Sequence, residues 1–285
     1  MAMATGITGS SVIADHSIEI TGKDAAALGD VAAHFTPGTA VNVTYLGNEP
    51  LSARVEACRV AREHGFRPVP HLSARRIVNE AELRQFLSAL SEVNANDEMF
   101  VVGGDPSEPY GPYDDGLALI RTGLLQEYGV RRVGITGYPE GHPNIDDSAL
   151  WDALEHKIEA ATQQSMQVSV TTQFGFDAEA VIQWIELVRR RGITVPIRVG
   201  VPGPASVRRL LGFASRFGVK SSAGIVSKYG ISLTRLIGST GPDRFIDTLA
   251  GRLTAAHGQV LVHFYTFGDL AATAAWVLAR KERIS

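Results

Sequence analysis

Residues 67–104 read RPVPHLSARRIVNEAELRQFLSALSEVNANDEMFVVGG. Two short runs rich in β-branched and apolar residues, Arg67–Ser73 and Glu98–Gly104, flank the stretch Glu80–Glu92, in which apolar residues recur with a helical spacing. This order predicts a strand, a helix and a second strand. Because the chain returns through a helix, the two strands are expected to lie parallel in one sheet.

The same alternation continues on both sides of this stretch. Further strands are predicted at Ser17–Thr21, Ala40–Leu46, Arg131–Pro139, Gln167–Phe174, Pro196–Val201 and Gln259–Thr266. Further helices are predicted at Leu51–His64, Ser148–Thr162 and Ala178–Arg191. Residue types that start or stop helices agree with this pattern: we expect N-caps at Asp24 and Asp177, and helix ends at Gly65, Gly129, Gly192 and Gly218.

Eight strand–helix units in 285 residues favour one α/β domain over residues 1–285, a closed (β/α)8 TIM barrel, which usually needs roughly 250 residues. A doubly wound open sheet would place a glycine-rich turn after its first strand, but here Thr21-Gly22-Lys23 follows. Residues 1–14 are expected to form a flexible tail. The alternation breaks between Gly218 and Pro242, where we expect an extra active-site loop or a short helix.

Composition excludes several classes of function. The net charge is −3 and no basic run stands out, so nucleic acid is not an expected partner. No apolar run reaches the ~18 residues of a membrane helix, and Met1–Ser10 lacks the pattern of a secretory signal. The lone cysteine, Cys58, is expected to be a small buried residue in a reducing cytoplasm. No zinc motif is present, so no metal is expected.

Polar residues at the carboxyl ends of barrel strands face the mouth, where barrel enzymes place their chemistry. The candidates are Glu19, Thr44, Tyr45, His71, Asp105, Tyr138, Glu140, His142, Gln173, His263, Tyr265 and Thr266. Glu19 is the most specific, because a carboxylate between Ile18 and Ile20 is costly to bury, and apolar neighbours would raise its pKa. Asp105 also fits a simple turn, and His71 a hydrogen-bonded core histidine.

Several of these segments, in this order, resemble the successive blocks of the methylenetetrahydrofolate reductase family. They are Val43-Thr44-Tyr45, Pro70-His71-Leu72, Gly104-Asp105, Tyr138-Pro139-Glu140-Gly141-His142-Pro143, Thr172-Gln173-Phe174-Gly175-Phe176-Asp177 and His263-Phe264-Tyr265-Thr266. The resemblance implies a (β/α)8 barrel that reduces 5,10-methylenetetrahydrofolate to 5-methyltetrahydrofolate with hydride from NADH or NADPH. That activity belongs to one-carbon metabolism and methionine biosynthesis.

The resemblance also implies roles for individual residues. Glu19 matches the catalytic general acid, which protonates the folate so that its methylene bridge opens to an iminium cation. Asp105 and Gln173 match residues that hold the pterin, and Thr44 and Tyr265 are expected beside them as substrate-binding residues. The residues implied at the cofactor are His71, Tyr113, Tyr138, His142 and Tyr229.

This sequence departs from the family where a flavin would be held. Gly103 replaces an arginine, and Leu150, Ala153 and His156 stand where the family places Asp, Asn and Arg; Lys157 is kept. A pyrophosphate needs cationic or N–H partners. Some divergent members of the family are flavin-free, and this chain resembles them, so we expect direct hydride transfer from the nicotinamide.

Three alternatives stay open at this point. The first is the same reaction through bound FAD, with Arg75, Arg76 or Lys157 as new phosphate partners. The second is a non-redox folate-binding protein that transfers methyl groups, and the third is a non-catalytic folate-binding paralogue. Because mere binding needs no buried acid, the presence of Glu19 argues against the third.

Overall fold

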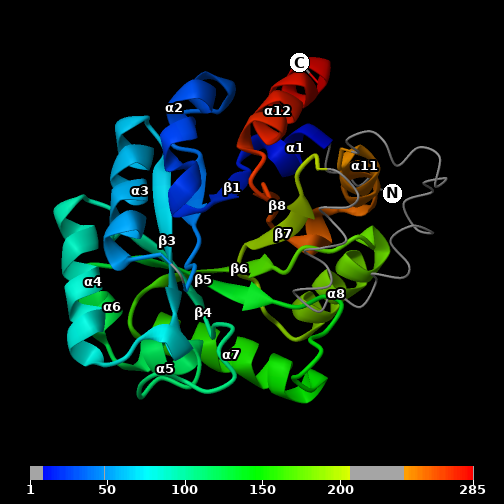
Figure 1. Ribbon diagram of the computed structural model, residues 1–285. Helices are drawn as coiled ribbons and strands as arrows, with labels where there is room; N and C mark the ends of the chain where they lie inside the picture. Colours follow the sequence, from blue (N-terminus) through cyan, green and yellow to red (C-terminus); the bar gives the residue numbers. More distant parts are fainter. Residues whose placement is uncertain (1–8, 48, 206–240, 285) are drawn as a thin grey trace. The chain divides into compact units, whose positions relative to one another are not determined.

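The computed structural model describes residues 9–47, 49–205 and 241–284. Eight parallel strands pair in chain order and close into a barrel (Figure 1). The strands are β1 (Ser17–Ile20), β2 (Ala40–Val43), β3 (Arg67–Ser73), β4 (Glu98–Val102), β5 (Arg132–Gly137), β6 (Gln167–Thr172), β7 (Ile197–Pro202) and β8 (Val260–Tyr265). The predicted (β/α)8 barrel is therefore confirmed.

Helices alternate with these strands along the chain. The α-helices are α1 (Gly9–Ala14), α2 (Leu28–Val31), α3 (Leu51–Glu63), α4 (Glu80–Glu92), α5 (Gly116–Arg121), α6 (Leu124–Glu127), α7 (Asp147–Gln163), α8 (Ala178–Arg190), α11 (Asp243–Arg252) and α12 (Leu270–Ile284). Short 3-10 helices are η1 (Gly22–Ala27), η2 (Ala32–His34), η3 (Ala74–Arg76) and η6 (Ala255–His257). Within the described ranges, no helix is long and apolar enough to span a bilayer.

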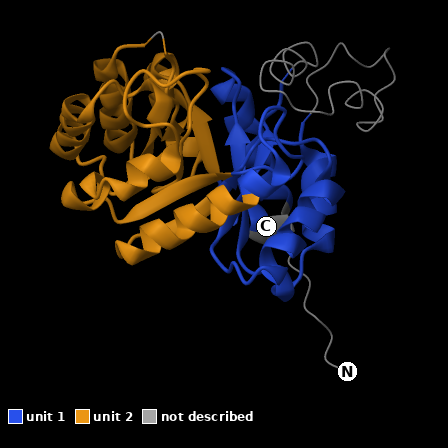
Figure 2. Cartoon of the chain, turned by 90° about the horizontal axis from the view of Figure 1, so that it is seen from below, with its two compact units in different colours: residues 1–16, 137–150, 171–285 blue, residues 17–136, 151–170 orange. Residues whose placement is uncertain are grey.

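The chain divides by its internal contacts into two compact units, coloured separately in Figure 2. Unit 1 comprises residues 1–16, 137–150 and 171–285, and unit 2 comprises residues 17–136 and 151–170. The single domain over residues 1–285 stays a prediction.

Unit 2 owes its core to the alternation of side chains along each strand. On one face Ala40, Val69 and Phe100 pack together with Val102. On the other face of β2, Val41 and Val43 are fully buried, as are Ala57, Cys58 and Ala61 on the neighbouring α3. Full burial of a residue of valine size or larger contributes about 1.5–3 kcal/mol, so both faces stabilise the unit.

The loop after β4 is held by Arg75, which belongs to η3 after β3. Its Nε donates to Asp114 O at 2.8 Å, and its Nη1 donates to Ser107 O at 3.1 Å and to Pro106 O at 3.2 Å. Its backbone N–H donates to Gly103 O at 2.9 Å. One arginine thereby satisfies several carbonyls of a segment that lacks regular structure.

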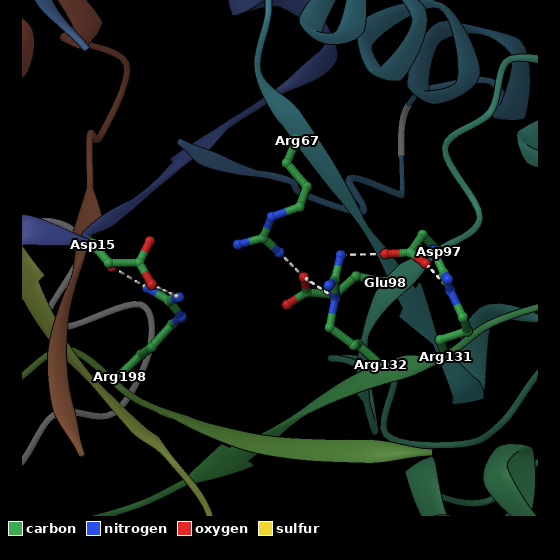
Figure 3. Close-up of polar contacts among 7 residues, drawn as sticks. All are labelled: Asp15, Arg67, Asp97, Glu98, Arg131, Arg132 and Arg198. Atoms are coloured by element: carbon green, nitrogen blue, oxygen red, sulfur yellow. Dashed lines mark hydrogen bonds and ion pairs between the residues drawn. The ribbon is translucent and has the colours of Figure 1, made fainter. Parts of the chain in front are cut away.

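At the amino ends of β3, β4 and β5, unit 2 carries a network of ion pairs. Glu98 pairs with Arg67 and with Arg132, while Asp97 pairs with Arg132 and Arg131 (Figure 3). Only 10% of the Glu98 side chain is exposed. Barrel enzymes place their chemistry at the opposite, carboxyl ends of the strands, so this network serves stability.

In unit 1 the short helix α1 packs on β8, α11 and α12. Val12 and Ile13 are 0% and 2% exposed. The expectation of a flexible tail over residues 1–14 was therefore wrong for Gly9–Ala14; residues 1–8 lie outside the described ranges. Asp15 directly follows α1, and its backbone carbonyl accepts a hydrogen bond from Arg198 at 2.7 Å, a contact that Figure 3 also shows.

Two predicted helix starts had different outcomes. Asp177 is the N-cap of α8 and accepts from Glu179 N and Ala180 N. Asp24 is not a cap: Thr21 is the N-cap of η1, and Asp24 stands three residues on and accepts from the Thr21 N–H and hydroxyl at 2.9 Å. Asp24 is therefore the third residue of a capping box, in which an acidic side chain accepts from the N-cap residue.

Candidate active site

Glu19 lies in β1, and its carboxylate Oε2 is 3.6 Å from His71 Nε2 of β3. The two side chains are 19% and 7% exposed. Because side chains alternate along a strand, Ile18 and Ile20 point to the opposite face from Glu19. The flanking isoleucines therefore do not share the face of the strand on which the carboxyl approaches His71. The raised pKa expected for Glu19 stays a prediction.

Two further predicted site residues of unit 2 are His71, in β3, and Thr44, directly after β2. The imidazole of His71 packs against the ring of Phe100, with centroids 4.8 Å apart. The backbone N–H of Thr44 donates to Ile20 O at 2.9 Å, which extends the pairing of β1 and β2 to the strand ends. The Thr44 hydroxyl is buried and has no hydrogen-bond partner among the described residues. It is therefore a group that a ligand would satisfy.

Asp105 stands at the carboxyl end of β4 and is held by Arg76. Arg76 Nε donates to Asp105 Oδ1 at 2.8 Å, and Nη2 donates to Oδ2 at 2.7 Å. The Asp105 side chain is 67% exposed, whereas that of Arg76 is 14% exposed. The carboxylate is thus fixed from its protein side and presented to solvent on the other.

Tyr113 lies further along the same loop and is 7% exposed. Burial raises the pKa of its phenol, with a further contribution from Glu80 of α4 and an opposing one from Arg84. Its neighbours are therefore residues of α4. The expected role of Tyr113 at the cofactor stays a prediction.

In unit 1, Gln173 and Tyr265 gather around the end of β6. Gln173 N donates to Gly137 O at 2.8 Å, and its side-chain Oε1 accepts from Phe174 N at 3.0 Å. The Tyr265 hydroxyl donates to Thr172 O at 3.1 Å, and its ring meets that of Phe174 edge to face at 5.4 Å between centroids.

Tyr138 and His142, from the segment after β5, contact each other edge to face with centroids 5.3 Å apart. His142 Nδ1 accepts from Asn144 N at 3.2 Å, and burial lowers the pKa of the imidazole. A neutral ring at neutral pH is the consequence. Glu140, from the same segment, accepts from Phe176 N at 3.3 Å. Tyr229 and most of the Gly218–Pro242 segment lie outside the described residues.

Three further residues lie near these sites: His263, a predicted candidate; Arg54, which the sequence analysis did not single out; and Arg76, which it named only as a possible phosphate partner. His263 is fully buried, and its ring lies 4.8 Å from that of Tyr265; their spacing of two positions along β8 places both on one face. Arg54 of α3 is 2% exposed, with its guanidinium carbon 3.3 Å from the centroid of the Tyr45 ring. Arg76 carries the pair with Asp105, a contact that spacing along the chain does not reveal.

A flavin diphosphate would need cations that are free to bind it. Nε and Nη1 of Arg75 are bound to backbone carbonyls, and Arg76 is bound to Asp105. Burial lowers the pKa of Lys157, which also faces Asp115. On α7, Leu150 and Ala153 offer no cation. The described residues of this region therefore do not fit a tightly held FAD.

Among the residues described, no group of three or more His, Cys, Asp or Glu side chains gathers closely enough to hold a metal ion. The polar groups instead consist of one acid beside a histidine, a fixed carboxylate, and an amide near aromatic rings. These are groups for proton transfer and for binding a planar heterocycle. The fold is that of a barrel whose two units each carry such polar groups near the carboxyl ends of their strands.

A family model described as methylenetetrahydrofolate reductase matches residues 30–277, so the chain belongs to that family. A curated relative, methylenetetrahydrofolate reductase 1 of Schizosaccharomyces pombe, is 31% identical over 87 residues, which is 30% of this chain and 13% of the relative. The match thus spans a small part of that relative.

Two solved structures are similar over most of the chain. A thermostable aldo-keto reductase has a TM-score of 0.47 at 12% identity, over 95% of this chain and 90% of its own. Dihydropteroate synthase from Thermus thermophilus has a TM-score of 0.47 at 14% identity, over 97% of this chain and 96% of its own.

Proposed function

We propose that this protein reduces 5,10-methylenetetrahydrofolate to 5-methyltetrahydrofolate with hydride from NADH or NADPH, and that it does so in the cytoplasm. Its membership of the methylenetetrahydrofolate reductase family supports the reaction class. The observation that carries the proposal is the carboxyl of Glu19 in β1 with His71 Nε2 3.6 Å away. A protein that only bound the folate would not need a mostly buried acid at this position.

In the proposed reaction Glu19 acts as the general acid. Its proton goes to the bridge nitrogen that leaves, and the carbon–nitrogen bond breaks to give an iminium cation on the other nitrogen. NAD(P)H supplies a hydride to that carbon, which becomes the methyl group. General acid catalysis of this kind contributes about 10²–10⁴-fold in rate.

The other predicted residues would position the folate. A pterin presents adjacent N–H donors and a carbonyl acceptor, which suit the Asp105 carboxylate and the Gln173 amide. We assign Thr44 and Tyr265 to the same substrate, and His71, Tyr113, Tyr138, His142 and Tyr229 to the region of the nicotinamide. The unpartnered hydroxyl of Thr44 supports its assignment.

We further propose that the hydride passes directly from the nicotinamide to the folate, without a flavin. This proposal is supported by the hydrogen bonds that already engage Arg75 and Arg76, by the burial that lowers the pKa of Lys157, and by the apolar residues Leu150 and Ala153 on α7. Proximity of the two reactants is then the main contribution of the barrel besides the acid.

The visible spectrum of the purified protein, followed by an assay of NADH and NADPH oxidation, tests both proposals. We expect a colourless protein that oxidises one of the two nucleotides when methylenetetrahydrofolate is present and FAD is not added. With nicotinamide deuterated at its transferable position, the deuterium should appear in the product's methyl group. A yellow protein with stoichiometric FAD would overturn the direct transfer, and folate binding without nucleotide oxidation would favour a methyl-transfer or binding protein.

A further inference from the structure

Arg76 lies in one segment at the carboxyl ends of neighbouring strands in unit 2 and contacts two others. It belongs to η3, which follows β3, and its guanidinium is bidentate to Asp105 after β4. Its guanidinium carbon is 5.9 Å from the centroid of the Tyr45 ring, after β2. A Cβ built on Gly47, in the same loop as Tyr45, would stand 1.8 Å from Arg76 Nη1. The guanidinium therefore fills the space over Gly47.

Stability does not explain the pair of Arg76 and Asp105. An ion pair whose carboxylate is exposed contributes little to folding, because water and salt screen it. With 67% of its side chain exposed, Asp105 is such a group. Arg76 is by contrast only 14% exposed, and its guanidinium lies against Gly47. The arrangement is one in which a mostly buried cation sets the direction of an exposed carboxylate.

Arg76 leaves Asp105 with capacity for a second partner. An ionised carboxylate has about four acceptor positions, and a bidentate guanidinium uses two of them. The remaining positions are on the exposed side of Asp105, where adjacent N–H groups of a ligand can bind. Neighbouring Arg75 binds the backbone of the same loop, at Pro106, Ser107 and Asp114, so that the segment carrying Asp105 is also fixed.

We propose that Arg76 is a positioning residue for the folate: it orients Asp105 so that the carboxylate binds the pterin. This inference rests on the proposed function. Arg76 also has an opposing effect on the rate, because its positive charge weakens the attraction of Asp105 for the iminium cation. Removing the guanidinium should impair folate binding, because Asp105 loses its orientation. The rate of the bound complex should change much less, because the lost orientation and the stronger attraction for the cation offset each other.

The test compares Arg76→Gln, Arg76→Lys and a matched control, Arg84→Gln. Arg84 also binds two carboxylates, Glu80 at 2.8 Å and Glu127 at 2.7 Å, but it lies on α4. For Arg76→Gln we expect the KM for folate to rise about tenfold, which corresponds to ~1.4 kcal/mol, with kcat changed less than about threefold. Arg76→Lys keeps the charge but not the fork, so it should recover part of the KM. Arg84→Gln should change neither constant.

A double variant separates positioning from a general effect on the fold. If Arg76 acts through Asp105, Arg76→Gln should add less than about twofold to the KM of Asp105→Asn, because the two changes remove one interaction. Three outcomes would each overturn the proposal. The KM increases of Arg76→Gln and Asp105→Asn could multiply fully in the double variant, the KM could be unchanged in Arg76→Gln, or the KM could rise equally in Arg84→Gln. Thermal unfolding of every variant identifies loss of fold, in which case Arg76→Lys supplies the deciding comparison.

Equilibrium binding of 5-methyltetrahydrofolate, measured by calorimetry, distinguishes failure of this inference from failure of the proposed function. If the wild type binds the folate but does not oxidise nucleotide, the reductase proposal fails. A tenfold weaker Kd in Arg76→Gln, with Arg84→Gln unchanged, would then still support the role of Arg76. Turnover in the wild type with the same folate Kd in both variants would sink the role of Arg76 and leave the reductase standing.

Discussion

At the scale of single residues, the decisive one is Glu19. Replacing its carboxyl by an amide removes the proton but keeps the shape, so Glu19→Gln should fold and bind folate normally. Turnover should fall at least about a hundredfold, since that is the usual contribution of a general acid. Steady-state kinetics with NADH or NADPH and methylenetetrahydrofolate measures the effect. A rate near that of the wild type would remove Glu19 from the mechanism.

Glu19 could be singled out from the sequence, because a glutamate inside a β-branched run is unusual, but its contact with His71 could not. His71 belongs to β3, about fifty positions along the chain, and period two along β1 turns Ile18 and Ile20 to the other face. Likewise, the spacing of Arg76 and Asp105 along the chain does not predict their contact, because contacts between loops depend on the closed fold.

At the scale of elements, prediction was most accurate where the apolar period is strong. β3 and α4 have the bounds expected, Arg67–Ser73 and Glu80–Glu92. β2, β4, β5 and β6 are shorter than predicted at their carboxyl ends, because the chain leaves the ladder there to form the loops of the mouth. The short helix α1 was missed, since six small and apolar residues carry no helical period.

Gly47 provides a prediction about the β2–α3 loop. Gly47→Ala should displace the Arg76 guanidinium, because the added Cβ would lie 1.8 Å from Nη1, and a flexible side chain moves more readily than backbone. We expect a severalfold higher KM for folate with a change in unfolding free energy below about 1 kcal/mol. Gly251→Ala is the control, since a Cβ there meets nothing within 4 Å. If both variants behave alike in the folate assay, the loop does not act through Arg76.

At the scale of the whole molecule, stability depends on the network around Glu98 (Figure 3). In Glu98→Gln the partly buried guanidinium groups of Arg67 and Arg132 lose a common anion. Breaking a fully buried pair costs about 3–5 kcal/mol, and the partial exposure here reduces the expected loss to about 2 kcal/mol. Urea denaturation followed by circular dichroism measures it. Arg190→Gln, which removes a solvent-exposed pair with Glu186, should cost less than about 1 kcal/mol.

His16 predicts how stability depends on pH. Burial lowers the pKa of its imidazole from 6.5 to about 4, with Lys281 and Arg198 adding to the effect and Ile13 O and Asp15 opposing it. Since the unfolded chain takes up the proton first, stability is complete above pH 6.5 and falls as the pH drops toward 4. Lowering the pH from about 7.5 to 5 should reduce the free energy of unfolding by about 2 kcal/mol through His16. Denaturation of His16→Gln at about pH 7.5 and 5 should show a free energy of unfolding that falls by about 2 kcal/mol less than in the wild type. An equal fall in wild type and variant would contradict the assignment.

The position of α1 has a consequence for synthesis of the chain. Its partners β8, α11 and α12 lie more than two hundred residues downstream, so α1 leaves the ribosome before the elements that it packs on. At about 5–20 residues per second, Val12 and Ile13 wait on the order of ten seconds or more before β8 emerges. Unit 2 can assemble in the meantime from residues translated earlier. The amino-terminal helix is thus among the last pieces to dock, and its two apolar side chains are what a chaperone would meet on the nascent protein.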